Sequence, residues 1–257
     1  MSTAIITLSE QGARVARRLA TALGNCQVFL HESVASEAGE QSFQAVVPLT
    51  ARIFLNYQRL VYVAPCGAVV RAIAPMVAHK LTDPAVVVVD VGYRWAISLL
   101  SGHEGGANDL ALAVSNLLDS EPVITTTSEA ARTLIVGIGC QRGTPAETLL
   151  AVIQEGLLRA GGTLDEVRYI ASAKIKSDEL GLREACAALG IPLRFIAEDA
   201  IRACSRDFNQ SSFVLEKVNM PAVAEPSALL AGTRTSCILK RTIIKGATIA
   251  IARENCC

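Results

Sequence analysis

Short aliphatic runs alternate with longer segments of helical periodicity along most of the chain. The run "AVVVV" at 85–89 shows the first pattern. The segment 68–79 shows the second, because its larger apolar side chains share one helical face. Those side chains are Val69, Val70, Ile73, Met76 and Val77. The alternation predicts βαβ units and a mainly parallel sheet.

In the first half of the chain, the pattern predicts five strands and three helices. The strands are Ala4–Leu8, Leu60–Ala64, Ala85–Asp90, Ala96–Leu99 and Val123–Thr126. Two of the helices are Gly12–Leu23 and Ala68–His79. A third helix begins near Gly106, where Leu110, Ala111, Val114, Leu117 and Leu118 repeat the helical spacing.

The segment 127–133, "TSEAART", predicts a domain boundary, because a new strand starts directly after it. The second half then predicts strands and helices in this order: Leu134–Gly139, helix Pro145–Ala160, Val167–Ser172, helix Leu182–Leu189, Ser236–Lys240 and Ala247–Ala252. We expect an α/β fold of two domains. Residues 1–130 form a Rossmann-like domain with a mainly parallel sheet, and residues 131–257 form a three-layer α/β/α domain with a mixed sheet.

Composition limits the class of ligand. Lys plus Arg and Asp plus Glu are 24 each, so the formal net charge is zero, which argues against a broad nucleic-acid surface. A mean hydropathy of +0.38 is high, yet the apolar runs are far shorter than the roughly 18 residues that span a bilayer. The N-terminus lacks the basic region of a signal peptide. We therefore expect a cytoplasmic protein with neither nucleic-acid nor membrane partners.

The eight cysteines do not form a metal-binding pattern. No CxxC pair occurs, and the only close pair is Cys256 and Cys257. Zinc sites need paired ligands a few residues apart, so we expect no metal site and mostly buried, reduced thiols. Cys140 is the thiol of most interest because it lies in a glycine loop.

The stretch "GIGCQRGTPAE" at 137–147 follows a predicted strand and opens a helix. Thr144, Pro145 and Glu147 predict a capping box with proline at the first helical position. The glycines are spaced GxGxxxG rather than GxGxxG, which disfavours a dinucleotide site. An anion site for a carboxylate, helped by Arg142, is one alternative, and a well-capped turn without a ligand is the other.

The stretch "SGHEGGAND" at 101–109 joins a predicted strand to a predicted helix and is the richest in functional groups. Glycines 105 and 106 let the backbone approach a ligand, and His103 can act as a base or acid near neutral pH. Glu104 could orient that ring or share the proton transfer. N-capping by Asn108 or Asp109 would explain much of the loop but would leave His103 and Glu104 unexplained.

Other ionisable side chains occur at predicted strand ends and turns. They are Lys80, Asp83, Asp90, Lys174, Lys176, Asp178, Glu179, Glu225 and Lys240. Glu225 precedes a helix that is predicted to begin at Pro226, and Lys240 ends a predicted strand. Each could be a solvated surface charge. Because ligands bind beyond the carboxyl ends of strands in open α/β sheets, Lys174, Lys240 and Arg71 are candidates for that edge.

Long motifs carry a family resemblance. The stretches "VAPCGAVVRAIAPM", "HKLTDPAVVVVDVGYRWAISLLSGHEGGANDLA" and "VITTTSEA" resemble the N-terminal region of the CbiG family, the cobalt-precorrin-5A hydrolases of anaerobic cobalamin biosynthesis. The stretches "LIVGIGCQRGTPAE", "KIKSDELGL", "PAVAEPSALLAG" and "LKRTIIKGATIAIAR" resemble its C-terminal domain, which CobE-type proteins share. The resemblance covers about residues 60–253. Residues 1–50, the Asn219-Met220 pair and the proline-free "SDELGL" depart from it, and the middle insertion of longer members is absent.

The resemblance implies a substrate and a reaction. The substrate is a cobalt-containing tetrapyrrole with a δ-lactone, and the enzyme opens the lactone, breaks a carbon–carbon bond and releases acetaldehyde to give cobalt-precorrin-5B. The substrate carries the cobalt, so no cofactor of the protein is expected. The resemblance leaves room for a homodimer and for transient contact with neighbouring enzymes of the pathway.

We expect His103 to act as the general base, with Glu104 as its partner or substitute and Asn108 as a third catalytic residue. Glu104, Asp83 and Glu225 remain rival bases. The predicted substrate-binding residues are Arg71, Lys80, Asp83, Gly102, Gly105, Gly106, Arg142, Lys174, Glu225 and Lys240. We expect the cations among them to bind substrate carboxylates in a cleft between the two halves. We expect the backbone amides of Gly105 and Gly106 to bind the oxyanion. Two other functions remain open: a non-catalytic tetrapyrrole-binding accessory protein and a nucleotide-dependent enzyme.

Overall fold

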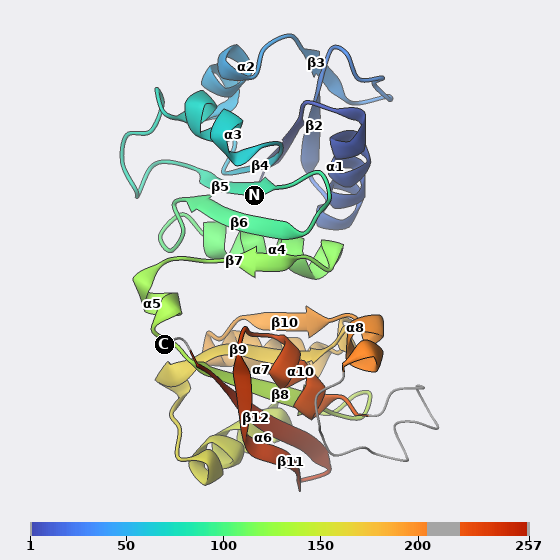
Figure 1. Ribbon diagram of the computed structural model, residues 1–257, viewed down its shortest axis with the longest axis vertical. Coiled ribbons are helices and arrows are strands. Elements are labelled where there is room, and N and C mark those ends of the chain that lie inside the picture. Colours follow the sequence, from blue (N-terminus) through green and yellow to red (C-terminus); the bar gives the residue numbers. More distant parts are fainter. Residues whose placement is uncertain (1, 205–221, 256–257) are drawn as a thin grey trace. The chain divides into compact units, whose positions relative to one another are not determined.

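The computed structural model describes residues 2–204 and 222–255, and the chain divides into two units, Met1–Thr126 and Thr127–Cys257 (Figure 1). The first unit contains a seven-stranded sheet in the order β3-β2-β1-β4-β5-β6-β7. The strands are β1 (Thr3–Thr7), β2 (Cys26–His31), β3 (Gln41–Phe43), β4 (Arg59–Val63), β5 (Ala85–Val89), β6 (Trp95–Leu100) and β7 (Glu121–Val123). A short helix, α5 (Thr127–Ala130), starts the second unit.

Strand β6 runs antiparallel to β5, whereas all other neighbours in this sheet are parallel. Leu100, at the end of β6, pairs with Val86 near the start of β5. The loop after β6 therefore lies at the edge where β4 and β5 begin, opposite the edge where ligands usually bind in parallel sheets.

Helices cover both faces of the first sheet. Helices α1 (Glu10–Leu23) and α4 (Ala107–Leu118) pack on one face, and α2 (Val46–Ile53) and α3 (Cys66–Ile73) pack on the other (Figure 1). Because side chains alternate along a strand, Ile5 belongs to the first core and Ile6 to the second. Both are fully buried.

The second unit contains a five-stranded mixed sheet in the order β10-β9-β8-β12-β11. Its strands are β8 (Leu134–Gly139), β9 (Val167–Ala173), β10 (Leu193–Ile196), β11 (Thr235–Ile244) and β12 (Ala247–Glu254). Strands β8, β9 and β10 are parallel, while β12 is antiparallel to both β8 and β11. Short 3-10 helices, η1 (Leu164–Glu166) and η2 (Lys174–Lys176), flank β9.

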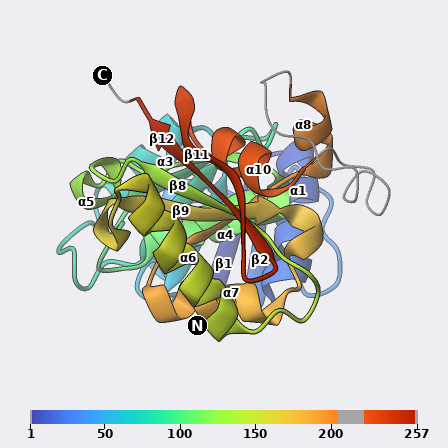
Figure 2. The same cartoon turned by 90° about the horizontal axis from the view of Figure 1, so that it is seen from below.

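Helices α6 (Ala146–Ala160) and α7 (Leu180–Leu189) share a core with one face of this sheet. Helix α10 (Ala224–Leu230) covers the other face, and α8 (Glu198–Ala203) follows β10 (Figure 2). A Cβ atom at Gly137 would lie 1.9 Å from the Ala224 carbonyl oxygen, so α10 approaches β8 only because that position is glycine. The three layers and the mixed sheet confirm the predicted fold class.

Most predicted strands agree with the structure within one or two residues, and Leu134–Gly139 agrees at both ends. The strand predicted to end at Lys240 is wrong: β11 continues to Ile244 and turns at Lys245 and Gly246, which both have positive φ. Two such residues form a tight hairpin turn, so β11 pairs with β12 up to the turn. The prediction missed β2, β3, α2, β10 and α8. The last predicted strand of the first half, Val123–Thr126, starts two residues and ends three residues after β7.

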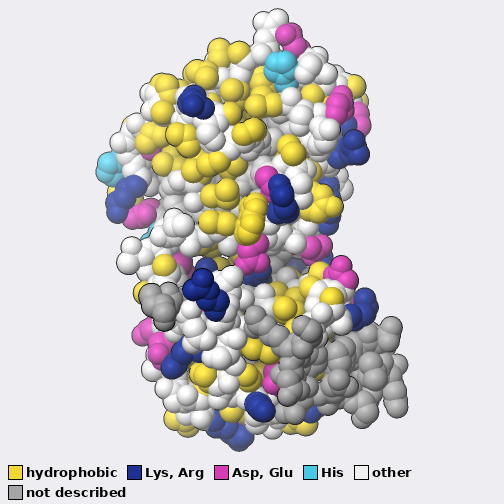
Figure 3. Space-filling model, viewed as in Figure 1, with side chains coloured by type: hydrophobic (Ala, Val, Ile, Leu, Met, Phe, Trp, Pro, Cys, Tyr) yellow, Lys and Arg dark blue, Asp and Glu magenta, His cyan; other side chains and the backbone are white. Residues whose placement is uncertain are grey.

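Two helix predictions are also wrong in detail. Helix α6 begins at Ala146 with Pro145 as its N-cap residue, and no capping box forms, because the Thr144 hydroxyl donates to the Gln141 carbonyl at 2.8 Å. Helix α3 ends at Ile73, and Val70 and Val77, expected on its buried face, are 45% and 44% exposed. Hydrophobic side chains gather over α2 and α3 on the surface in Figure 3.

No helix in residues 2–204 and 222–255 is long and apolar enough to cross a membrane. The expected lack of membrane partners, like the expected lack of nucleic-acid partners, stays a prediction.

Candidate functional site

The loop 101–106 joins β6 to α4, as the sequence predicts, and its base is held by backbone and side-chain hydrogen bonds. The Ser101 hydroxyl donates to the Asp83 carbonyl at 3.1 Å, while the Ala107 amide donates to the Ser101 carbonyl at 3.1 Å. The Asn108 amide donates to the Gly102 carbonyl at 2.9 Å. Ser101 has a φ of +57°, an uncommon value that these bonds stabilise.

Asn108 is buried beneath this loop, with 8% of its surface exposed. Its Oδ1 accepts a hydrogen bond from the Ser98 hydroxyl at 2.8 Å, and its Nδ2 donates to the Thr126 hydroxyl at 3.0 Å. A Cβ atom at Gly102 would lie 2.9 Å from Asn108 Oδ1 and 2.8 Å from Thr126 Cγ2. The burial of Asn108 points to positioning of the loop rather than contact with a substrate.

The N-capping alternative for this loop is wrong. Gly106 is the N-cap residue of α4, with a φ of +80°, and no side chain caps the helix. Asn108 is instead committed to Ser98 and Thr126, and Asp109 is exposed in the first turn.

The tip of the loop faces solvent, since His103, Glu104 and Gly105 are all exposed. Glu104 accepts a hydrogen bond from Lys80 Nζ at 2.6 Å, and this bond lowers the pKa of the Glu104 carboxyl. The charge of His103 acts in the same direction on that pKa. Among the described residues, no hydrogen bond uses the amides of Gly105 or Gly106, so both are available as donors to a ligand.

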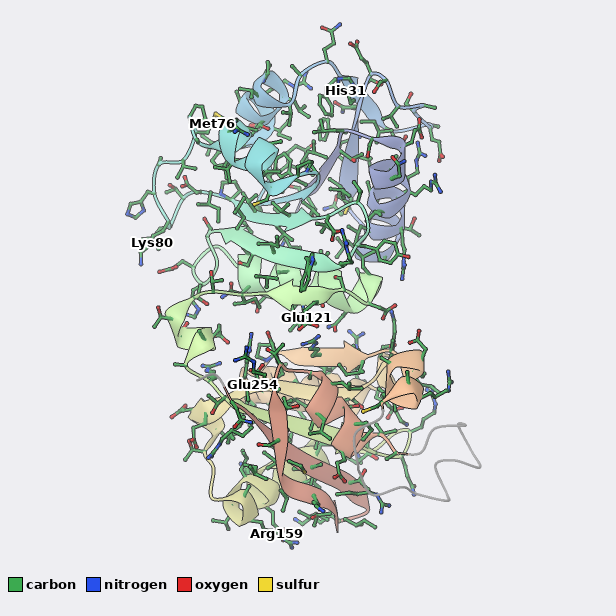
Figure 4. All side chains as sticks on the ribbon, viewed as in Figure 1. His31, Met76, Lys80, Glu121, Arg159 and Glu254 are labelled. Atoms are coloured by element: carbon green, nitrogen blue, oxygen red, sulfur yellow. The ribbon has the colours of Figure 1, made fainter. Side chains whose placement is uncertain are left out.

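Lys80 lies in the segment between α3 and β5, which packs beside the loop (Figure 4). Asp83 holds this segment in place: its buried carboxylate accepts the Ala78 amide at 3.1 Å, and its carbonyl accepts the Ser101 hydroxyl. His79 is exposed next to Lys80, and its Nδ1 accepts the Leu81 amide at 3.3 Å. The structure thus brings together the predicted residues Lys80, Asp83, Gly102, His103, Glu104, Gly105, Gly106 and Asn108.

Ser98, Ser101, Thr126 and His79 belong to this site, and none was singled out as a site residue from the sequence. Ser98 and Thr126 lie 10 and 18 positions from Asn108 along the chain. Neutral hydroxyls carry no charge pattern, so only the folded sheet reveals them. His79 could have been identified from the sequence, because it directly precedes the predicted site residue Lys80.

Arg71 does not lie where the sequence placed it. It occupies the last turn of α3, away from the carboxyl end of β4 at which the helix starts. Its side chain is exposed and makes one long hydrogen bond, at 3.3 Å, to the Gly67 carbonyl.

A second polar group follows β8 and β9 in the second unit. Arg142, predicted to bind a carboxylate ligand, pairs with Asp178 at 2.8 Å and lies 3.8 Å from Glu179. This pairing lowers the pKa of Asp178. The buried Glu179 carboxylate also accepts the Gly143 amide at 3.0 Å, which ties the loop after β8 to the segment before α7. Arg142 is therefore already neutralised by side chains of this chain.

Lys174 directly follows β9, at the edge that the sequence predicts. Lys176 lies close enough to Cys140 to affect its thiol: burial raises the pKa of Cys140, and the Lys176 charge partly opposes this. No group of three or more His, Cys, Asp or Glu side chains suited to a metal ion occurs in the part of the chain that the structure describes.

Glu225 and Lys240 differ from their predicted positions. Helix α10 begins at Ala224, not Pro226, so Glu225 lies in its first turn and is only 1% exposed. Its carboxylate accepts the Arg241 amide at 3.2 Å. Lys240 lies in the middle of β11, not at its end, so the predicted cations of the second unit do not share one strand edge.

Comparison with known sequences matches both units to one family. The family model described as Cobalamin synthesis G N-terminal matches residues 48–129, and the one described as Cobalamin synthesis G C-terminus matches residues 134–252. The cobalt-precorrin-5A hydrolase of Priestia megaterium is 37% identical over 140 residues, covering 52% of this chain and 37% of the relative. The cobalt-precorrin-5A hydrolase of Salmonella typhimurium is 40% identical over 129 residues, covering 50% of this chain and 36% of the relative. Each alignment thus spans less than two fifths of the relative.

The Protein CobE of a Sinorhizobium species is 30% identical over 128 residues, covering 49% of this chain and 83% of the relative. Among solved structures, that of CobE, a protein from the cobalamin biosynthetic pathway, is 35% identical, with a TM-score of 0.44 and coverage of 47% of this chain and 89% of that one. The structure of a putative cobalamin biosynthesis protein G homolog from Sulfolobus solfataricus is 19% identical, with a TM-score of 0.39, and covers 99% of this chain and 97% of that one.

The two α/β units and the matches to both of them define a protein of cobalamin biosynthesis. Within that class, the chain belongs to the cobalamin synthesis G family, CbiG. Over 49% of its length, the chain is also related to CobE. The resemblance inferred from the sequence motifs is confirmed.

Proposed function

We propose that the chain hydrolyses cobalt-precorrin-5A, opening its δ-lactone and releasing acetaldehyde to give cobalt-precorrin-5B. Relatives named for this activity support the proposal. The observation that carries it is the loop 101–106, which exposes the His103 imidazole and two backbone amides that make no hydrogen bond to the described residues, and which Asn108 holds in place from below. Ester hydrolysis needs a proton acceptor such as the imidazole and hydrogen-bond donors such as the amides.

In the first step, His103 takes a proton from water, and the hydroxide attacks the lactone carbonyl. The amides of Gly105 and Gly106 donate to the oxyanion that forms. Collapse of this intermediate breaks the ring C–O bond, and His103 gives its proton to the departing alkoxide, which becomes the free hydroxyl of the two-carbon unit. The new carboxylic acid on the macrocycle loses its proton to solvent and becomes a carboxylate.

In the second step, removal of the hydroxyl proton lets the carbon–carbon bond break. The oxygen lone pair becomes the carbonyl of acetaldehyde, and the bonding electrons enter the cobalt-containing macrocycle, which belongs to the substrate. The released macrocycle carbon then takes up a proton. His103, which has returned its first proton to the alkoxide, can accept the hydroxyl proton and deliver it to that carbon.

The rival bases are less well placed. Asp83 and Glu225 are buried, and their carboxylates accept backbone amides. Glu104 is exposed, but the Lys80 hydrogen bond lowers its pKa and so weakens it as a base. We assign Glu104 and Lys80 to holding the loop and to substrate contact. In the first unit, Arg71 and Lys80 are the proposed partners of substrate carboxylates. Arg142 is already paired with Asp178, and the roles of Lys174 and Lys240 in substrate binding stay predictions.

The proposal is tested by incubating the purified chain with cobalt-precorrin-5A under anaerobic conditions. Acetaldehyde is trapped as a hydrazone, and the tetrapyrrole product is analysed by mass spectrometry. We expect one acetaldehyde per substrate and a product that has gained H2O and lost C2H4O. An intact lactone with no aldehyde would contradict the proposal.

A non-catalytic pigment-binding role is the second candidate. The alignment with the CobE relative spans 83% of that relative, whereas the alignments with the hydrolase relatives span 37% and 36% of theirs. Tight binding of cobalt-precorrin-5A without acetaldehyde formation would favour this role. A thermal shift with NAD(P) would support the nucleotide-dependent alternative, which the glycine spacing disfavours.

A further inference from the structure

Helix α3 carries more apolar surface than its core uses. Val69 and Ile73 are buried, at 0% and 4% exposure, and pack with the core under α2 and α3. Val70 and Val77 are nearly half exposed, and Leu81 is 66% exposed. A monomer gains nothing by setting several large apolar side chains together in water, so a contiguous group indicates a binding surface.

Val70 and Val77 share one face of the helix and of the turn that follows it. The Ala74 amide donates to the Val70 carbonyl at 3.0 Å, and the Val77 amide donates to the Ile73 carbonyl at 3.2 Å, so helical geometry continues past Ile73. Positions 70, 74 and 77 are then spaced i, i+4 and i+7 on one face. We call Val70, Ala74, Val77 and Leu81 the α3 apolar strip; all four are exposed.

The strip leads to the loop that carries His103. The Asp83 carboxylate accepts the Ala78 amide, which folds the segment 78–83 back onto the end of the helical turn. This segment is joined to the loop twice, by Lys80 to Glu104 at 2.6 Å and by Ser101 to Asp83 at 3.1 Å. Leu81 directly follows Lys80 in the sequence, so it is the member of the strip nearest to these contacts along the chain.

The charges within the strip's own segment have one sign, although Lys80 also binds the Glu104 carboxylate at 2.6 Å. Across residues 66–81, the only Lys, Arg, Asp or Glu side chains are Arg71 and Lys80. Both are exposed. An apolar surface with a cation toward each end complements a flat apolar ring that carries carboxylates on its rim.

We propose that the α3 apolar strip binds one face of the tetrapyrrole ring, while Arg71 and Lys80 pair with its rim carboxylates and bring the lactone to the His103 loop. This subsite rests on the proposed function for the identity of its ligand. A second copy of this chain fits less well, because a two-fold contact centred on the strip would bring the cations Arg71 and Lys80 of one copy close to the cations of the other.

The test measures binding of cobyrinic acid, a cobalt corrinoid with free carboxylates, by absorbance titration and calorimetry on the full chain. The variants are Val77→Glu and Leu81→Glu, which set a carboxylate in the strip. The matched control is Leu158→Glu, at a position 79% exposed on α6 of the second unit. Thermal unfolding verifies that each variant folds.

We expect the wild-type chain and Leu158→Glu to bind alike, and the two strip variants to bind about tenfold more weakly or worse, since each adds repulsion to lost apolar contact. Equal binding by all four proteins, or no binding by the wild type, would overturn the subsite. A wild-type dimer in sedimentation that both strip variants dissociate, with unchanged corrinoid binding, would also overturn it and assign the strip to self-association.

The outcome is separable from that of the hydrolase proposal. Strip-dependent corrinoid binding without acetaldehyde formation would refute hydrolysis and support the subsite. Acetaldehyde formation with normal KM in Val77→Glu and Leu81→Glu would support hydrolysis and refute the subsite.

Discussion

The side-chain amide of Asn108 donates a hydrogen bond to the Thr126 hydroxyl at 3.0 Å, across 18 positions of sequence. This contact joins the first turn of α4 to the last residue of the first unit. Gly102 packs against both side chains, so the base of the loop 101–106 has little room to shift. The positions of His103 and of the two free amides therefore depend on a pair of neutral side chains behind them.

Replacing either member of this pair should slow the reaction more than it weakens substrate binding. Asn108→Ala leaves the Ser98 and Thr126 hydroxyls without a buried partner, which should lower the free energy of unfolding by about 1–3 kcal/mol. Thr126→Val removes the acceptor alone, and Thr126→Ser should restore it. Urea unfolding gives the stability, and steady-state kinetics should show a fall in kcat with KM nearly unchanged. A Thr126→Val enzyme with wild-type kcat would refute the positioning role.

The two glycines at the tip should respond differently to alanine. A Cβ at Gly105 would lie 2.4 Å from Ser101 Cβ and 2.9 Å from the Ser101 carbonyl oxygen, so Gly105→Ala must displace the loop. No atom of the described residues lies within 4 Å of a Cβ placed at Gly106. Only the positive φ of this residue opposes a side chain, which should lower the free energy of unfolding by about 1–2 kcal/mol. Activity should fall further in Gly105→Ala than in Gly106→Ala, and Gly106→Asn should be tolerated best. Equal losses at both positions would show that the contact with Ser101 is unimportant.

Removing Lys80 should raise the pKa of Glu104, because its hydrogen bond to Glu104 is the largest cause that lowers that pKa. A carboxyl whose pKa is lower when folded adds stability above its unfolded pKa, roughly 4.3, and that stability is lost as the pH falls through the folded value. Carbon-detected NMR titration of the Glu104 carboxyl in wild type and Lys80→Met measures the change. Asp178, whose pKa is lowered by Arg142, should be unaffected and serves as the internal control.

Alkylation should distinguish the thiols by burial. Cys66 is exposed, whereas burial raises the pKa of Cys186 to about 12 and of Cys237 to about 11. Burial also raises the pKa of Cys140, despite the nearby Lys176. Iodoacetamide at pH 8, read by peptide mass spectrometry, should modify Cys66 first and leave Cys140, Cys186 and Cys237 largely intact. Rapid labelling of Cys140 would indicate a reactive thiol and a different role for the loop after β8.

The sequence predicts the elements better than it predicts their surroundings. Strand Leu134–Gly139 and the start of α4 follow from local periodicity and glycine positions, which the fold preserves. The antiparallel direction of β6 was not predicted, although the sequence carries a signal for it: the link from Asp90 to Arg94 is too short for the crossover that joins neighbouring parallel strands. That direction decides which edge of the sheet carries the His103 loop.

Periodicity also fails to show how wide a buried face is. It grouped Val70 and Val77 with Val69 and Ile73, although only the latter two meet the core. The sequence identified Asn108 as a site residue but not its partners, since Thr126 reaches it only when β7 lies beside β6. Glu225 and Arg142 carry the expected charges, yet their partners within the chain emerge only from the folded second unit.

The most direct test of the central claim is the rate of acetaldehyde release from cobalt-precorrin-5A by His103→Gln and by His31→Gln. His31 is a matched control, because its ring is held by Ser33 at 2.8 Å and the Gln44 carbonyl at 3.0 Å, outside the loop. Loss of a general base should lower the single-turnover rate by about 100-fold or more in His103→Gln, with His31→Gln near wild type. A His103→Gln protein that releases acetaldehyde at the wild-type rate would contradict the account.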